Sequence, residues 1–138
     1  MGTFLDTNVI VYAFDRAEPE KQARARSILA GSLDSVAVSS QILSEFYAVV
    51  TRKLQPALSA RAAGEAAAHL SQLVTVVPLD ATLVLSAMAL AQAHHLSLWD
   101  AQIIVAAQRA GCTTLLTEDL PDGQTIAGVA LRNPFVQP

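Results

Sequence analysis

Four acidic side chains stand where an α/β protein can bring them together, and together they could hold a divalent cation. Asp6 follows one short apolar segment and Asp119 follows another, so both are expected beyond the carboxyl ends of parallel strands. Glu45 and Asp100 lie in segments whose apolar residues have helical spacing. If the four carboxylates converge, their repulsion raises some of their pKa values unless cations bind between them.

The helical phase of two of these acids places them near buried faces. In the helix expected over 41–53, Glu45 falls about 40° outside the apolar stripe, at its rim. In the helix expected over 98–110, Asp100 falls inside an apolar stripe that includes Trp99, which we expect to be a core residue. A lone buried carboxylate costs several kcal/mol, so Asp100 needs a hydrogen-bonding partner or a metal ion.

The type of ligand indicates the type of ion. An all-oxygen set favours the hard cations Mg²⁺ and Mn²⁺. The chain has one cysteine, Cys112, and its His94-His95 pair is expected to end a helix rather than to bind a metal. Such ions activate water and clamp a phosphate between the attacking and leaving oxygens. The four acids therefore predict hydrolysis of a phosphodiester bond.

Each acid also has an ordinary structural explanation. Asp6 and Asn8 could cap a helix, and Asp100 could form a capping box with Ser97. Glu45 could be a solvated acid. Asp119, with its neighbours Glu118 and Asp122, could be a turn residue before a glycine. Each explanation is reasonable alone, but four at once, at strand ends and helix rims, explain the pattern less well than one shared site.

The elements that must position these acids alternate between short strands and longer helices. Strands are expected over 2–5, 35–39, 75–78 and 113–116, and a hairpin around Gly128. Helices are expected to carry 9–14, to begin at Pro19, and to cover 41–53, 59–73, 80–95 and 98–110. The alternation predicts one domain over 1–138, a three-layer α/β/α sandwich with a mainly parallel central sheet.

Composition narrows the class of protein. Apolar residues make up 52% of the 138 residues, which excludes intrinsic disorder. The longest apolar run, Val9–Phe14, is far shorter than the ~20 residues of a membrane span, so neither membrane insertion nor a secretory signal is expected. The single Cys112 fits a reducing cytoplasm.

Charge and hydrophobicity indicate partners. Twelve acidic and nine basic residues give a net charge of −3, which argues against broad, charge-driven coating of nucleic acid. Six basic residues could still line a local RNA path, or form a solvated surface: Arg16, Lys21, Arg24, Arg26, Arg52 and Lys53. The high apolar content predicts an exposed patch that serves a homodimer and a partner segment over the site.

Four short motifs follow one another along the chain. They are Phe4–Tyr12 with Asp6, Ser44-Glu-Phe46 with Glu45, Trp99-Asp-Ala101 with Asp100, and Leu116–Leu120 with Asp119. Together they resemble the PIN-domain ribonucleases, particularly the VapC-type toxins of prokaryotic toxin–antitoxin modules. One such motif is weak, whereas four in this order and spacing are a specific signal.

The resemblance implies a PIN-like fold and an Mg²⁺- or Mn²⁺-dependent endoribonuclease, often dimeric and silenced by a cognate antitoxin. It carries Asp6, Glu45, Asp100 and Asp119 over as catalytic, metal-binding acids. Asn8 and Thr117 lie beside them, where they could orient a ligand or water. Glu118 and Asp122 add two acids near the fourth position, and Asp119 is the favoured ligand among the three.

Two other classes of function remain to be weighed. A catalytically silent PIN-like module would bind RNA or protein without turnover, although all four acids are present. A phosphohydrolase or phosphoreceiver would also have an acid after its first strand. Proteins of that class use a lysine late in the chain to hold the phosphoryl group, but the last lysine here is Lys53. In addition, Thr7-Asn8 supplies no second acid after Asp6. We therefore set this third class aside.

Overall fold

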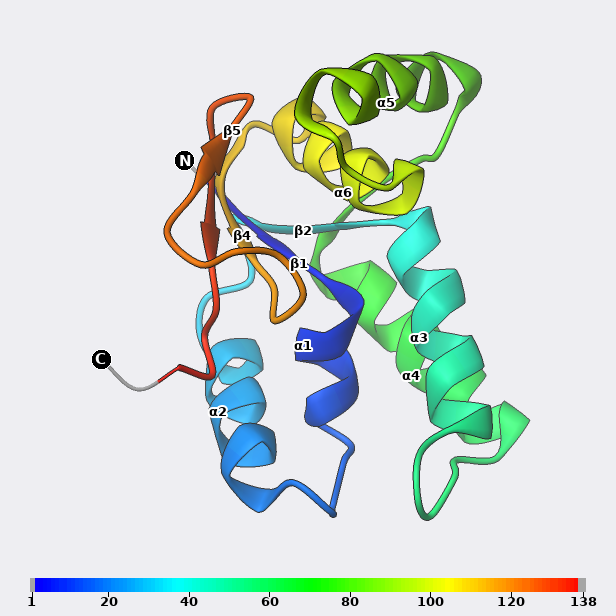
Figure 1. Ribbon diagram of the computed structural model, residues 1–138. Coiled ribbons are helices and arrows are strands. Elements are labelled where there is room, and N and C mark those ends of the chain that lie inside the picture. Colours follow the sequence, from blue (N-terminus) through cyan, green and yellow to red (C-terminus); the bar gives the residue numbers. More distant parts are fainter. Residues whose placement is uncertain (1, 137–138) are drawn as a thin grey trace.

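The computed structural model describes residues 2–136 and has one six-stranded sheet between two layers of helices (Figure 1). The strands are β1 (Gly2–Leu5), β2 (Val36–Ser39), β3 (Thr75–Val77), β4 (Cys112–Leu116), β5 (Thr125–Ile126) and β6 (Val129–Arg132). The helices are α1 (Thr7–Tyr12), α2 (Pro19–Ala30), α3 (Ser40–Arg52), α4 (Ala60–Leu73), α5 (Ala81–His94) and α6 (Leu98–Arg109).

The sheet has the order β3-β2-β1-β4-β6-β5, and only β5, paired to β6, is antiparallel. Helices α5 and α6 cover one face, and α1 to α4 lie on the other (Figure 1). The expected three-layer sandwich with a mainly parallel sheet is therefore confirmed. Because β1 lies between β2 and β4, the carboxyl ends of these three parallel strands meet at one edge of the sheet.

The core explains why the short strands are almost wholly apolar. Phe4 and Leu5 in β1 and Leu115 in β4 are fully buried, as are Phe46 in α3 and Ile104 in α6. A strand covered by helices on both faces has no solvent side, so it does not alternate apolar with polar residues. These strands hold their ends, and the side chains that follow them, in fixed positions.

Local signals set most of the helix boundaries. Ser59, Asp80 and Ser97 each accept a hydrogen bond from a backbone N–H of the following helix, as N-caps do. His95 ends α5 in the left-handed conformation, with φ 55°, so it acts as the expected cap. The hairpin around Gly128 is present as β5 and β6, and its two turn residues, Ala127 and Gly128, have φ 52° and 80°.

Helix α6 differs from its expected two-sided pattern. Every residue from Ala101 to Ala107 is buried, because the helix is enclosed between α5 and the sheet. Its first turn projects beyond this cover. Trp99 is 61% exposed, so the expectation that it is a core residue is wrong. Asp100 is half-buried, rather than enclosed in an apolar stripe.

In the described part of the chain, no single helix combines the length and apolar composition of a membrane span. The pair α5 and α6 reaches both together, but with a bend of 116° between the two helices.

Candidate active site

A cleft of about 700 Å³ opens at the edge of the sheet where β1, β2 and β4 end. All four acids singled out from the sequence line it: Asp6, Glu45, Asp100 and Asp119. They come from the end of β1, from α3, from the first turn of α6 and from the loop after β4. The structure thus brings together side chains that lie far apart in the sequence.

Asp6 is the most enclosed of the four, with 4% of its surface exposed. One carboxylate oxygen, Oδ1, accepts from the backbone N–H of Thr7 over 2.7 Å and caps α1. The other, Oδ2, accepts from the Thr117 hydroxyl over 2.7 Å. Burial raises the pKa of Asp6 to about 6, with smaller contributions from the charges of Asp119 and Glu45, against the lowering effect of both hydrogen bonds.

Glu45 is held by two polar side chains. Its Oε1 accepts from the Thr7 hydroxyl over 2.7 Å, and its Oε2 accepts from Gln41 Nε2 over 3.3 Å. Gln41 in turn accepts from the buried Gln102 over 2.9 Å, which ties α3 to α6. The sequence analysis did not identify Thr7 or Gln41 as site residues. Thr7 lies inside the first motif, between Asp6 and Asn8, and that position was the one available signal.

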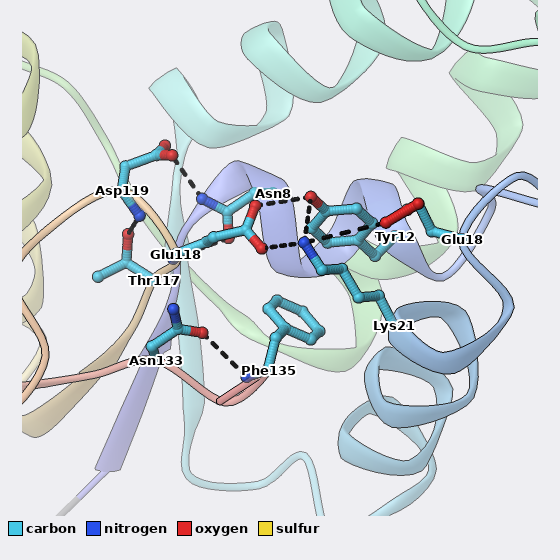
Figure 2. Close-up of polar contacts among 9 residues, drawn as sticks. All are labelled: Asn8, Tyr12, Glu18, Lys21, Thr117, Glu118, Asp119, Asn133 and Phe135. Atoms are coloured by element: carbon cyan, nitrogen blue, oxygen red, sulfur yellow. Dashed lines mark hydrogen bonds and ion pairs between the residues drawn. The ribbon is translucent and has the colours of Figure 1, made fainter. Parts of the chain in front are cut away.

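Asn8 links two of the acids. Its amide Nδ2 donates to Asp119 Oδ2 over 3.1 Å and lies 3.5 Å from Asp6 Oδ2. The backbone N–H of Asp119 donates to the Thr117 hydroxyl over 3.1 Å (Figure 2). Since that hydroxyl also donates to Asp6, Thr117 contacts both acids. The expected supporting pair, Asn8 and Thr117, therefore lies between the ends of β1 and β4.

Asp100 meets the cleft in a different way. Its backbone N–H donates to the Ser97 hydroxyl over 3.1 Å, which is one half of a capping box. Among residues 2–136, no side chain donates to its carboxylate, so that group is free to face the cleft that it lines. The expected compensation of a buried charge is not needed, since Asp100 is half-exposed to water.

The neighbouring acid Glu118 points away from the cleft. Its two oxygens accept from Tyr12 over 2.6 Å and from Lys21 over 2.5 Å, while Lys21 also donates to Tyr12 over 3.2 Å (Figure 2). The Lys21 charge also lies 4.8 Å from the centre of the Tyr12 ring, and the Phe135 ring packs on Tyr12 at 4.9 Å. This cluster fastens α1 and α2 to the loop after β4.

Asp122 serves a turn, as one of the structural explanations expects. Its Oδ1 accepts from the backbone N–H of Asn133 over 2.8 Å. Neither Asp122 nor Glu118 lines the cleft, so Asp119 is the one of the three neighbouring acids that reaches it.

Some of the basic residues make contacts outside the cleft, and others line it. Lys21 pairs with Glu118, and Arg24 and Arg26 donate to the backbone carbonyls of Pro134 and Ala13. Two basic residues at the end of α3 instead line the cleft: Arg52 and Lys53. Of the six basic residues that could line an RNA path or form a solvated surface, these two are the ones at the cleft.

The donor chemistry of the cleft fits a hard divalent cation. Five acidic residues line the hollow, the four described above and Asp15, and carboxylates form the all-oxygen set that Mg²⁺ and Mn²⁺ prefer. In the side-chain positions of residues 2–136, no three His, Cys, Asp or Glu residues form a group that could hold a metal ion. The Asn8 amide and the Thr7 and Thr117 hydroxyls instead donate to three of the carboxylates.

Comparison with known proteins gives one family. A family model described as PIN domain matches residues 3–120. No curated protein sequence matches the chain. A structure of VapC20 from Mycobacterium tuberculosis, described as a sarcin-ricin loop cleaving toxin, is 22% identical with a TM-score of 0.69, and the match covers 86% of this chain and 92% of that one.

Two further structures are similar over nearly the whole chain. A toxin-antitoxin complex from Klebsiella pneumoniae is 18% identical with a TM-score of 0.68, covering 96% of this chain and 98% of that one. A DNA-bound VapBC from Salmonella typhimurium is 17% identical with a TM-score of 0.66, covering 97% and 98%. At these identities the likeness is one of fold.

Proposed function

The chain belongs to the PIN domain family, and on that premise we propose that it is a divalent-metal-dependent endoribonuclease, the toxin of a type II toxin–antitoxin pair. One observation carries the proposal. Four acids from four separate parts of the chain line a single cleft at the carboxyl edge of the parallel sheet. No structural role is common to all four, because three of the carboxylates accept hydrogen bonds from different neighbours and the carboxylate of Asp100 accepts none among the described residues.

Asp6, Glu45, Asp100 and Asp119 are the residues that would hold the cation. When bound there, Mg²⁺ or Mn²⁺ supplies an activated water and neutralises charge on the phosphate under attack. The protein's own contribution is to keep the carboxylates apart and aimed. The Thr117 hydroxyl fixes Asp6, the Thr7 hydroxyl fixes Glu45, and the Asn8 amide fixes Asp119.

The proposed partners follow from the relatives and the surface. The Klebsiella and Salmonella structures are described as a toxin-antitoxin complex and as DNA-bound VapBC, and we propose a cognate antitoxin for this chain as well. We also propose a homodimer in the cytoplasm. Helix α5 exposes 64% of Leu85 and 42% of Met88, an apolar pair that a second subunit can cover.

The proposal is tested by cleavage assays on a panel of structured RNAs. We expect cleavage with Mg²⁺ or Mn²⁺, none in excess EDTA, and none by Asp100→Asn with an unchanged circular dichroism spectrum. An Asp100→Asn variant as fast as the parent protein contradicts the role given to Asp100. RNA binding without cleavage under any metal identifies the alternative expected from the sequence, a silent PIN-like binding module.

A further inference from the structure

Trp99 is a large apolar side chain with no structural task in the described part of the chain. It is 61% exposed, more than any other large aromatic side chain among the described residues. Within residues 2–136 its ring contacts no other aromatic ring and no cation, and its indole N–H donates to no partner. An aromatic ring left open in this way is available to a ligand.

The position of Trp99 ties it to the acidic cleft. It lines the cleft beside Asp100, in the first turn of α6. Its backbone carbonyl accepts from Gln41 Nε2 over 3.4 Å, and the same amide nitrogen lies 3.3 Å from Glu45 Oε2. The backbone of Trp99 is therefore hydrogen-bonded to α3, the helix that carries Glu45.

Helix α3 gives the order of groups along the cleft. Gln41, which holds the Trp99 backbone, lies one turn before Glu45. Arg52 and Lys53 lie two turns after Glu45, roughly 10 Å further along the helix axis. Both line the same cleft as Trp99. Along α3, Glu45 thus lies between the residue that holds Trp99 and a pair of cations, and the other three acids line the same cleft.

We propose that Trp99 is a stacking platform for a base of single-stranded RNA, and that Arg52 and Lys53 bind backbone phosphates at the other end of the cleft. Aromatic rings stack on unpaired bases, and basic side chains follow the phosphate chain. A strand held at both ends would lay its intervening phosphate over the acids. The inference rests on the proposed function, because it takes RNA as the substrate.

Trp99 is the single tryptophan of the chain, so its fluorescence reports on this site alone. The titration uses a short oligoadenylate in Mg²⁺ with the Asp119→Asn variant, which keeps Trp99 and prevents cleavage. We expect quenching by the oligoadenylate. The matching probe is the same sugar–phosphate chain without bases, which binds Arg52 and Lys53 but leaves the fluorescence unchanged.

Kinetics supply the second readout. We expect Trp99→Ala to raise the KM for single-stranded RNA about 10-fold with little change in kcat, and Trp99→Phe to stay within roughly threefold of the parent protein. The control is Tyr47→Ala, since Tyr47 is exposed on α3 and does not line the cleft. Removing the Arg52 and Lys53 charges lowers the salt slope of binding by about 1.4, at ~0.7 for each phosphate contact.

The outcomes separate this inference from the proposed function. Cleavage of RNA with no quenching and no effect of Trp99→Ala on KM overturns the inference and leaves the nuclease standing. Quenching without cleavage of any RNA supports the inference and overturns the nuclease. If sedimentation shows that Trp99→Ala splits a dimer, the ring belongs to a subunit contact, and the inference is overturned.

Discussion

The Thr117 hydroxyl donates to Asp6 Oδ2 over 2.7 Å and joins the end of β4 to the end of β1. Both residues are buried, and the acceptor is a carboxylate in a cleft of carboxylates. A hydroxyl is well suited to this place, because it adds a donor without adding a charge. The bond therefore fixes the most enclosed acid while leaving the charge of the site negative.

Replacing Thr117 with Val should lower the free energy of unfolding by about 1–3 kcal/mol, since a buried carboxylate oxygen loses its donor while the shape is kept. Urea denaturation in EDTA measures the change. Thr113→Val is the matched control, because Thr113 is an exposed residue of β4, the strand that Thr117 directly follows. Equal stabilities for the two variants would show that the bond contributes nothing.

Replacing Asp119 with Asn should lower RNA cleavage by roughly 100-fold or more, because several kcal/mol of charge stabilisation depend on the cation's ligands. Asp122→Asn is the control, since Asp122 holds only the Asn133 backbone, outside the cleft. Initial rates on one RNA at saturating Mg²⁺ make the comparison. The reverse ranking would make Asp122 the fourth ligand.

Asp6 should make the metal-free protein less stable as pH rises. Its pKa in the folded protein is about 6, above the ordinary 3.8, so the folded state holds the proton more tightly. The stabilising contribution is complete below pH 4 and lost by pH 6 to 7, a change of about 3 kcal/mol. Urea unfolding of the parent protein and of Asp6→Asn, compared in EDTA across this range, isolates the effect.

Asn suits this comparison because it caps a helix as well as Asp does. The stability difference between the two proteins should grow from pH 4 to pH 6 and shrink when Mg²⁺ is added. A difference that does not vary with pH would mean that Asp6 titrates in the folded protein as it does in the unfolded chain.

Replacing Lys21 with Met should lower the free energy of unfolding by about 1 kcal/mol, since Glu118 and Tyr12 lose a shared, partly solvated cation. Thermal melts measure the effect. Lys53→Met is the control, because Lys53 has no ion pair among those of the described residues. The salt dependence of RNA binding should rank the two variants the other way. Lys53→Met should lower the salt slope, and Lys21→Met should leave it unchanged.

Local signals carried most of the fold prediction. Caps such as Ser97 and Asp80, and the apolar strands before Asp6 and Asp119, can each be predicted from a few consecutive residues. The order of the strands in the sheet could not be predicted in this way, because it depends on which distant segments pair. The placement of the acids in one cleft agrees with the sequence analysis, while their catalytic roles stay predictions.

One error and one omission of the sequence analysis have physical causes. A helical wheel places Trp99 in the core because it assumes one buried stripe, whereas α6 is buried on all sides from Ala101 to Ala107 and open in its first turn. The ion pair between Lys21 and Glu118 joins residues far apart in the chain, so no local sequence pattern predicts it. Contacts of this kind decide which of several neighbouring acids remains free for the cleft.

The place of β4 in the sheet has a consequence for how the protein is made. This strand follows β1 in the chain only after β2, β3 and six helices, yet it pairs directly with β1 in the sheet. A nascent chain that has not yet emerged through β4 lacks the segment that brings Thr117 and Asp119 to Asp6. The growing polypeptide could therefore assemble its acidic cleft only after β4 and the loop that follows it have emerged.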